Sequence, residues 1–144
     1  MGRIIYDEQA RLLDWAAAHY ADAAVDGDTY AIGLEQSGEI VGVVLYNNFL
    51  EVACNMHVVS DGKRRWLTRD FLVHAFAYPF IQLGLNRVTA MVPASNTDAL
   101  TLDLKLGFQL EGRMTEAMPG DDVVILGMLR RHCKWIPEGF NYGR

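Results

Sequence analysis

The chain has 144 residues, of which 51% are hydrophobic and 22% charged, and its formal net charge at pH 7 is −5. This length fits a single domain over residues 1–144, and the composition is that of a folded globular protein rather than a disordered one. The acidic balance argues against a general nucleic-acid binder, so no DNA partner is expected. No apolar run reaches the roughly 20 residues that cross a bilayer, and Met1–Asp14 shows no signal peptide. We therefore expect a cytoplasmic protein without a membrane partner.

The first half of the chain predicts one helix followed by three strands. Apolar residues recur at helical spacing in the opening segment, and a turn-forming Asp-Gly-Asp cluster follows it. Runs rich in Ile, Val and Tyr, separated by turn residues, then indicate strands. The predicted elements are a helix from Tyr6 to about Ala24 and strands over residues 29–35, 39–45 and 49–59.

A long amphipathic helix is predicted from about Arg65 to Leu83, with Gly84 ending it. Pro79 is expected to kink this helix, because proline removes the hydrogen bond to the carbonyl of Ala75. The remaining chain predicts a strand, a helix and two final strands. These are a strand over residues 87–92, a helix between the capping residues 95–98 and Gly107, and strands over 108–115 and 123–129 joined around Pro119-Gly120.

The leucines at positions 100, 102, 104 and 106 alternate strictly, which by period alone would indicate a strand. The residues on either side favour a helix instead. Ser95 and Asp98 have the spacing of a capping box before the run, and Gly107 follows it as a helix stop. The predicted order of elements is therefore α-β-β-β-α-β-α-β-β.

Several short motifs, in order, resemble the GNAT superfamily of N-acetyltransferases, and most closely its branch that acetylates ribosomal-protein N-termini and small amines. The motifs are Leu83-Gly84-Leu85-Asn86-Arg87-Val88, Asn96, Lys105-Leu106-Gly107-Phe108 and Glu111-Gly112-Arg113. The resemblance implies an α/β (α+β) GNAT fold, in which a mixed central sheet carries helices on both faces. Its fourth and fifth strands, equated here with 49–59 and 87–92, would diverge into a V that holds acetyl-CoA as co-substrate.

The same resemblance implies a CoA-binding loop at the start of the long helix. Aligned with the family pattern [Q/R]-x-x-G-x-[G/A], the loop runs from Lys63 to Thr68, with Trp66 in place of the glycine. Basic side chains and helix-start amides would bind the phosphates, and the Trp66 indole would turn away from them. Asn96 would contact the pantetheine arm or cap its own helix. The expected cofactor-binding residues are Val58, Val59, Lys63, Arg64, Arg65, Trp66, Leu67, Thr68 and Asn96.

Glu51 and His57 are the candidate proton acceptors. In a strand over residues 49–59 both side chains lie on one face, where either could take the proton of an attacking amine. The alternative is that Glu51 is a solvated charge and His57 a hydrogen-bonded, half-buried residue. The family's tyrosine acid is replaced by Asp103, which at ordinary acidity is not expected to serve as an acid. Cys54 faces away from Glu51 and His57 and has no basic neighbour, so attack without a covalent acyl-enzyme is expected.

Three functions are open at this stage. The first is transfer of an acetyl group from acetyl-CoA to a primary amine, on a small molecule or a peptide. The second is a catalytically silent GNAT-fold module that binds CoA, a peptide or a protein. The third is a GNAT-fold transferase with another acyl donor such as aminoacyl-tRNA, whose phosphates the basic loop would contact. No metal site is expected, and a homodimer is compatible with all three.

Overall fold

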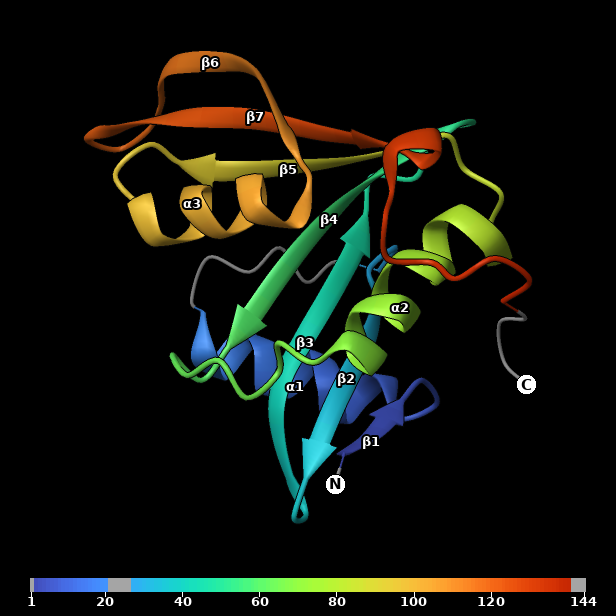
Figure 1. Cartoon of the computed structure of the whole chain (residues 1–144). Helices are drawn as coiled ribbons and strands as arrows, with labels where there is room; N and C mark the ends of the chain where they lie inside the picture. Colours follow the sequence, from blue (N-terminus) through green and yellow to red (C-terminus); the bar gives the residue numbers. More distant parts are fainter. Residues whose placement is uncertain (1, 21–26, 141–144) are drawn as a thin grey trace.

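A seven-stranded mixed sheet runs through the described part of the molecule, with strand order β1-β2-β3-β4-β5-β7-β6 (Figure 1). The structure is a computed structural model that describes residues 2–20 and 27–140. The strands are β1 (Gly2–Ile5), β2 (Tyr30–Gln36), β3 (Glu39–Asn47), β4 (Ala53–Ser60), β5 (Arg87–Pro93), β6 (Gln109–Met118) and β7 (Asp121–Leu129). The helices are α1 (Gln9–His19), α2 (Arg69–Ala77) and α3 (Thr97–Leu106), with a π-helical segment at Tyr78–Gln82 and a 3₁₀ turn at Arg130–His132.

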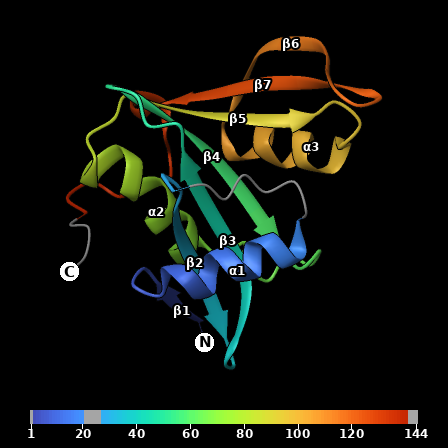
Figure 2. The ribbon, with the colours of Figure 1, turned by 180° about the vertical axis from the view of Figure 1, so that it is seen from behind.

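Helices cover both faces of the sheet, as expected. α1 lies on one face, while α2 and α3 lie on the other (Figures 1 and 2). Successive side chains of a strand point to opposite faces of the sheet, so each strand packs against the helices on both sides. In β3, for example, Val43 and Leu45 pack in the cluster beneath α1, and Val44 packs in the larger cluster beneath α2 and α3. The fold is therefore the predicted α+β sandwich of a sheet between two helical layers.

The predicted V in the sheet is confirmed. β4 and β5 run parallel and pair only from Ala53 to Asn55, which lie opposite Arg87 to Thr89. Both strands continue for several residues beyond this pairing but no longer meet. The edge of β4 from Met56 onward is thus left without a strand partner. In Figure 1 the two strands separate toward their carboxyl ends.

The N-terminal elements differ from the prediction in two places. The expected helix from Tyr6 begins only at Gln9, because Gly2–Ile5 forms the edge strand β1 paired with β2. Its predicted end, near Ala24, lies outside the described residues. β4 begins at Ala53 rather than at Phe49. Residues 49–52 instead form a turn, which follows Asn48 with its left-handed φ of 50° and is closed by a hydrogen bond from the Leu50 amide to the Ala53 carbonyl at 2.8 Å.

The long predicted helix also starts late and changes form at its end. α2 begins at Arg69, since Thr68 is its N-cap and accepts a hydrogen bond from the Phe71 amide at 3.2 Å. Pro79 does not simply kink the helix: the chain widens into a π-helical turn at Tyr78–Gln82. The segment ends near Gly84, whose φ of 68° is the left-handed conformation that glycine permits.

α3 confirms the choice of helix over strand, but a different residue caps it. The side chain of Asn96, not of Ser95, accepts the hydrogen bond from the Ala99 amide, at 3.2 Å. Ser95 instead donates its hydroxyl to Asp121, the first residue of β7, at 2.6 Å. Gly107 ends the helix as predicted, with φ of 116°. β6 and β7 are joined around Pro119-Gly120, also as predicted.

Candidate active site

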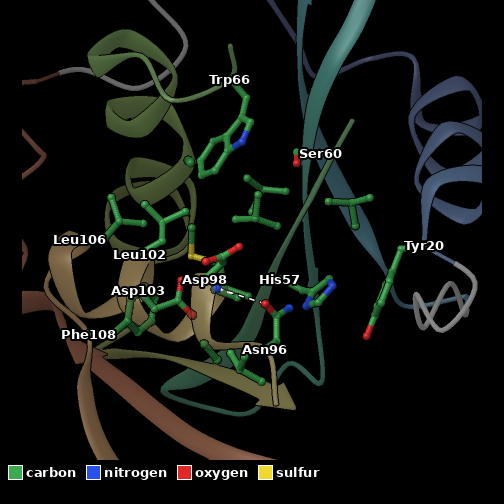
Figure 3. A pocket seen from close by; sticks show the side chains of 18 of the residues that line it. Tyr20, His57, Ser60, Trp66, Asn96, Asp98, Leu102, Asp103, Leu106 and Phe108 are labelled. Atoms are coloured by element: carbon green, nitrogen blue, oxygen red, sulfur yellow. Dashed lines mark hydrogen bonds between the residues drawn. The ribbon is translucent and has the colours of Figure 1, made fainter. Parts of the chain in front are cut away.

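The divergence of β4 and β5 opens a cavity of about 410 Å³ (Figure 3). Its walls come from the carboxyl half of β4, the loop before α2, the carboxyl half of β5 and the inner side of α3. Because Val52 in the turn before β4 accepts a hydrogen bond from the Arg87 amide, alternate peptide groups after it face β5. The peptide groups of Met56 and Val58 therefore face the open split, where no strand satisfies them. A ligand with its own amide groups can satisfy them.

One end of the cavity is positively charged. Lys63 and Arg64, both exposed, are among its lining residues. Within the described residues, the backbone amides of Arg64, Arg65 and Trp66 have no hydrogen-bond acceptor. Free amides next to cationic side chains are the usual components of a phosphate site. This end of the cavity is the one suited to an anionic group.

The structure places the free amides earlier in the loop than predicted. The Leu67 amide donates to the Arg64 carbonyl at 3.1 Å, and the Thr68 amide donates to the Trp66 carbonyl at 2.8 Å. Neither residue lines the cavity. The Arg65 side chain also lies elsewhere: it pairs with Asp61 at 2.7 Å and lines a separate hollow beside α1. Of the predicted loop residues, only Lys63, Arg64 and Trp66 therefore reach the cavity.

Trp66 occupies the roof of the cavity and is only 3% exposed (Figure 3). The residue packs directly on β3. A Cβ added at Gly42 would lie 2.5 Å from the Cβ of Trp66, so the close contact depends on glycine in that strand. The tryptophan thus fixes the loop to the sheet, in place of a glycine that would let a ligand approach closely.

His57 lines the cavity on the side of α1. Its ring stacks on that of Tyr20, with centroids 5.1 Å apart and planes 27° apart. Burial lowers the pKa of His57 below its ordinary value, so the imidazole is neutral at pH 7. A neutral imidazole is a proton acceptor. Sequence reasoning found His57 but missed Tyr20, whose role depends on contact between α1 and β4.

Asp103 faces the same cavity from α3, on the side opposite α1 (Figure 3). Burial raises its pKa from 3.8 to about 6. The expectation that this carboxyl has ordinary acidity is therefore wrong, because Asp103 is buried in a cavity whose lining is largely apolar and includes Phe76, Val92 and Leu106. Asp103 can hold a proton close to neutral pH, which an exposed aspartate cannot do.

The structure does not bring Glu51 and His57 together. Glu51 lies in the exposed turn before β4, at the end of the strand remote from the split, and does not line the cavity. Cys54 is buried in the core beneath α2, and burial raises its pKa to about 11. The thiol is protonated at neutral pH and is a poor nucleophile, as expected.

The other predicted residues lie around the split. Val58 and Val59 line it from β4, and Asn96 lines it from the start of α3. The Asn96 side-chain oxygen is engaged as the helix cap, so the cap is its observed role. In the described residues there is no group of three or more His, Cys, Asp or Glu side chains that could hold a metal ion. No described helix is long and apolar enough to cross a membrane.

Comparison with family models and with curated proteins finds no match. Solved structures do match. A mutant of the spermidine N-acetyltransferase SpeG from Vibrio cholerae aligns with a TM-score of 0.73 and 16% identity, over 90% of this chain and 94% of that one. The ribosomal-protein-S18-alanine N-acetyltransferase from Escherichia coli aligns with a TM-score of 0.71 and 18% identity, over 99% and 100% of the two chains. SpeG in complex with CoA and spermine aligns with a TM-score of 0.71 and 14% identity, over 91% and 96%.

These likenesses extend over nearly the whole of each chain, and they identify the fold. The chain has the GNAT fold, as its motifs predicted. At identities of 14–18% the likeness does not by itself carry over substrates or residues.

Proposed function

We propose that this protein transfers an acetyl group from acetyl-CoA to a primary amine by direct attack. The observation that carries the proposal is the cavity in the sheet split. It has cations and free amides at one end, and a neutral imidazole and a high-pKa carboxyl along its walls. The GNAT fold supports it, since the solved structures that share this fold include N-acetyltransferases of amines, one of them with CoA bound.

Acetyl-CoA would lie along the split. Its phosphates would meet the side chains of Lys63 and Arg64 and the amides of residues 64–66. Its pantetheine arm carries amide groups that would pair with the open peptide groups of Met56 and Val58. Trp66 would cover the arm from above. In this arrangement the extra charges of the loop offset the loss of the family's glycine.

The two titratable groups lie on opposite sides of the split, which suits direct transfer. The amine nitrogen attacks the thioester carbonyl carbon from the α1 side, and His57 accepts the proton that the amine releases. The carbon–sulfur bond then breaks, and Asp103 in its protonated form gives its proton to the departing thiolate. Whichever of the open β4 amides is not paired with the pantetheine arm would polarise the thioester carbonyl. Cys54, protonated and buried, takes no part.

The acceptor would enter on the side of Tyr20 and His57. Neighbours that share the fold act on spermidine and on a ribosomal protein, and both acceptors present a primary amine. We therefore propose a small-molecule or peptide amine as the acceptor class.

The test is acetyl-CoA binding by calorimetry to the wild type and to two charge-reversal variants. Lys63→Glu with Arg64→Glu should weaken binding at least tenfold, because each hydrogen bond from a charged group contributes about 1.5–3 kcal/mol. The matched control reverses Arg130 and Arg131, another exposed adjacent pair that lies outside the cavity. That control should bind as the wild type does.

The binding results can contradict the proposal in two ways. Failure of the wild type to bind millimolar acetyl-CoA would contradict it and favour the silent module or another acyl donor. Equal weakening in both variants would mean that net charge, not this loop, drives binding. Given binding, His57→Gln should lower turnover with a panel of primary amines at least tenfold while leaving acetyl-CoA affinity unchanged.

A further inference from the structure

Exposed apolar side chains gather at one corner of the molecule. Nine large apolar side chains are well exposed in the described residues, and five of them belong to the turn before β4 or to the end of the π-helical segment. These five, which are 36–61% exposed, are Phe49, Leu50, Val52, Ile81 and Leu83. A single exposed apolar residue is ordinary, but five of nine in two short segments indicate a contact surface.

Backbone hydrogen bonds hold these segments side by side. The Asn86 amide donates to the Val52 carbonyl at 2.8 Å, and the Arg130 amide donates to the Asn86 carbonyl at 2.9 Å. The turn before β4, the loop before β5 and the 3₁₀ turn after β7 therefore meet, as Figures 1 and 2 show. Since β4 and β5 are parallel, both begin here, and the split opens at their other ends. The surface is named the amino-end corner and consists of residues 48–52, 81–86 and 130–132.

The amino-end corner is cationic in a chain that is acidic as a whole. Arg130, Arg131 and His132 are exposed beside the apolar side chains. Glu51 is the only carboxylate in the three segments, so the corner carries more positive than negative charge, whereas the whole chain has a net charge of −5. Apolar side chains next to arginines match a partner that is anionic at its surface and apolar beneath. An anionic lipid layer has that composition.

The corner differs from the surfaces that usually bind peptides, which are grooves or free strand edges. None of its residues lines the cavity in the split or the hollow beside α1. The two strands that begin at the corner have no free edge there, because β4 pairs with β3 and β5 with β7. The observations therefore favour a lipid surface over a peptide.

We propose that the amino-end corner binds the surface of an anionic lipid bilayer. The side chains of Leu50, Val52 and Leu83 enter the boundary between headgroups and acyl chains, and Arg130 and Arg131 contact the lipid phosphates. The mouth of the split, at the opposite ends of β4 and β5, then faces water. The contact is independent of acetyl transfer. It needs no apolar run long enough to cross a bilayer, which is the run that the sequence lacks.

The first test is co-sedimentation of the full chain with phosphatidylcholine vesicles, with and without about one third phosphatidylglycerol. We expect binding to the anionic vesicles to be at least about tenfold tighter, and to weaken as salt is raised. Leu50→Gln with Leu83→Gln should weaken this binding at least about tenfold, because the apolar side chains no longer insert. Arg130→Gln with Arg131→Gln should do the same, because two cations near the phosphates are lost.

Two matched control pairs lie outside the corner. Leu104→Gln with Leu110→Gln removes two apolar side chains of similar exposure, 52% and 66%. Arg69→Gln with Lys105→Gln removes two exposed positive charges. Both pairs should bind as the wild type does. No binding of the wild type to anionic vesicles, equal binding to both kinds of vesicle, or equal weakening by a control pair would overturn the proposal. So would self-association without vesicles that the corner's leucine variant abolishes, because the occupant would then be a second copy.

The second test detects insertion itself. In a Cys133→Ser background, Leu50→Cys carries a polarity-sensitive dye, while the buried Cys54 stays unlabelled. On anionic vesicles the dye emission should shift to the blue, and brominated lipids should quench it. The same dye on Leu110→Cys should show neither change. Vesicle binding without these changes at residue 50 would place the lipid contact elsewhere and overturn the proposal.

Discussion

At the scale of single residues, Asp103 shows how packing changes chemistry. Sequence alone assigns it ordinary acidity, because nothing adjacent to it in the chain is unusual. Its pKa rises to about 6 only because α3 buries it against the sheet split. His57 changes in the opposite direction for the same reason, since burial disfavours its charged form. Burial therefore favours the neutral form of both side chains, protonated for Asp103 and deprotonated for His57.

The raised pKa of Asp103 makes the stability of the folded state depend on pH. The folded pKa of Asp103, about 6, lies above its ordinary value of 3.8, so the folded state holds more protons between these values. Stability is therefore lost as pH rises from 4 to 6, and the deficit persists above that range. Asp103→Asn should raise the free energy of unfolding by about 1–3 kcal/mol at pH 8 but by much less at pH 4. Urea denaturation at both pH values tests this, and an equal change at both would contradict it.

At the scale of elements, the sequence predicts helices and hairpins well where their form depends on residues close by in the chain. The β2–β3 hairpin, the helical state of α3 and the β6–β7 hairpin all follow from turn residues and caps. The errors are at β1 and at the starts of β4 and α2. β1 is four residues long and pairs only with the edge of β2, and three of the four residues at 49–52 are apolar although the segment forms an exposed turn. Such boundaries depend on neighbours that are distant in sequence.

The end of α2 shows how one element compensates another. Pro79 lacks the amide that would donate to the Ala75 carbonyl, and the hydroxyl of Tyr46 in β3 donates to that carbonyl instead. Both residues are fully buried, so an unmet carbonyl there would be costly. The sequence predicts the broken helical bond, whereas the tyrosine that replaces it comes from a strand 29 residues earlier.

Tyr46→Phe should therefore destabilise the protein by about 1–3 kcal/mol, the cost of an unsatisfied buried group. In a Pro79→Ala background the backbone amide of residue 79 can donate to the carbonyl, and the same substitution should cost measurably less. A double-mutant cycle by chemical denaturation gives the coupling energy. Strict additivity of the two changes would show that the hydroxyl does not compensate for the proline.

At the scale of the whole molecule, the sheet consists of two parts with a short common border. β1 to β4 form one part and β5 to β7 the other, and only three residue pairs of β4 and β5 join them. The family motifs predicted this split and part of the cavity lining, such as Trp66 and Asn96, but they did not predict which residues of other elements complete the lining. Tyr20 in the N-terminal part and Asp103 in α3 both line the cavity, while Glu51, close to His57 in sequence, lies outside it. Spacing along the chain predicts neighbours only inside a correctly bounded element.

A ligand in the split should stabilise the molecule by bridging the two parts. Acetyl-CoA at about 100 times its dissociation constant adds roughly 2.7 kcal/mol to the free energy of unfolding. Local hydrogen exchange should slow most, at least about tenfold, at amides that lack acceptors in the described structure: those of residues 64–66, and of Met56 and Val58 facing the split. The β6–β7 turn at Pro119-Gly120 lies outside the cavity and serves as the internal reference. Thermal stabilisation without slower exchange at these amides would place the ligand elsewhere, because a molecule bound in the split must contact them.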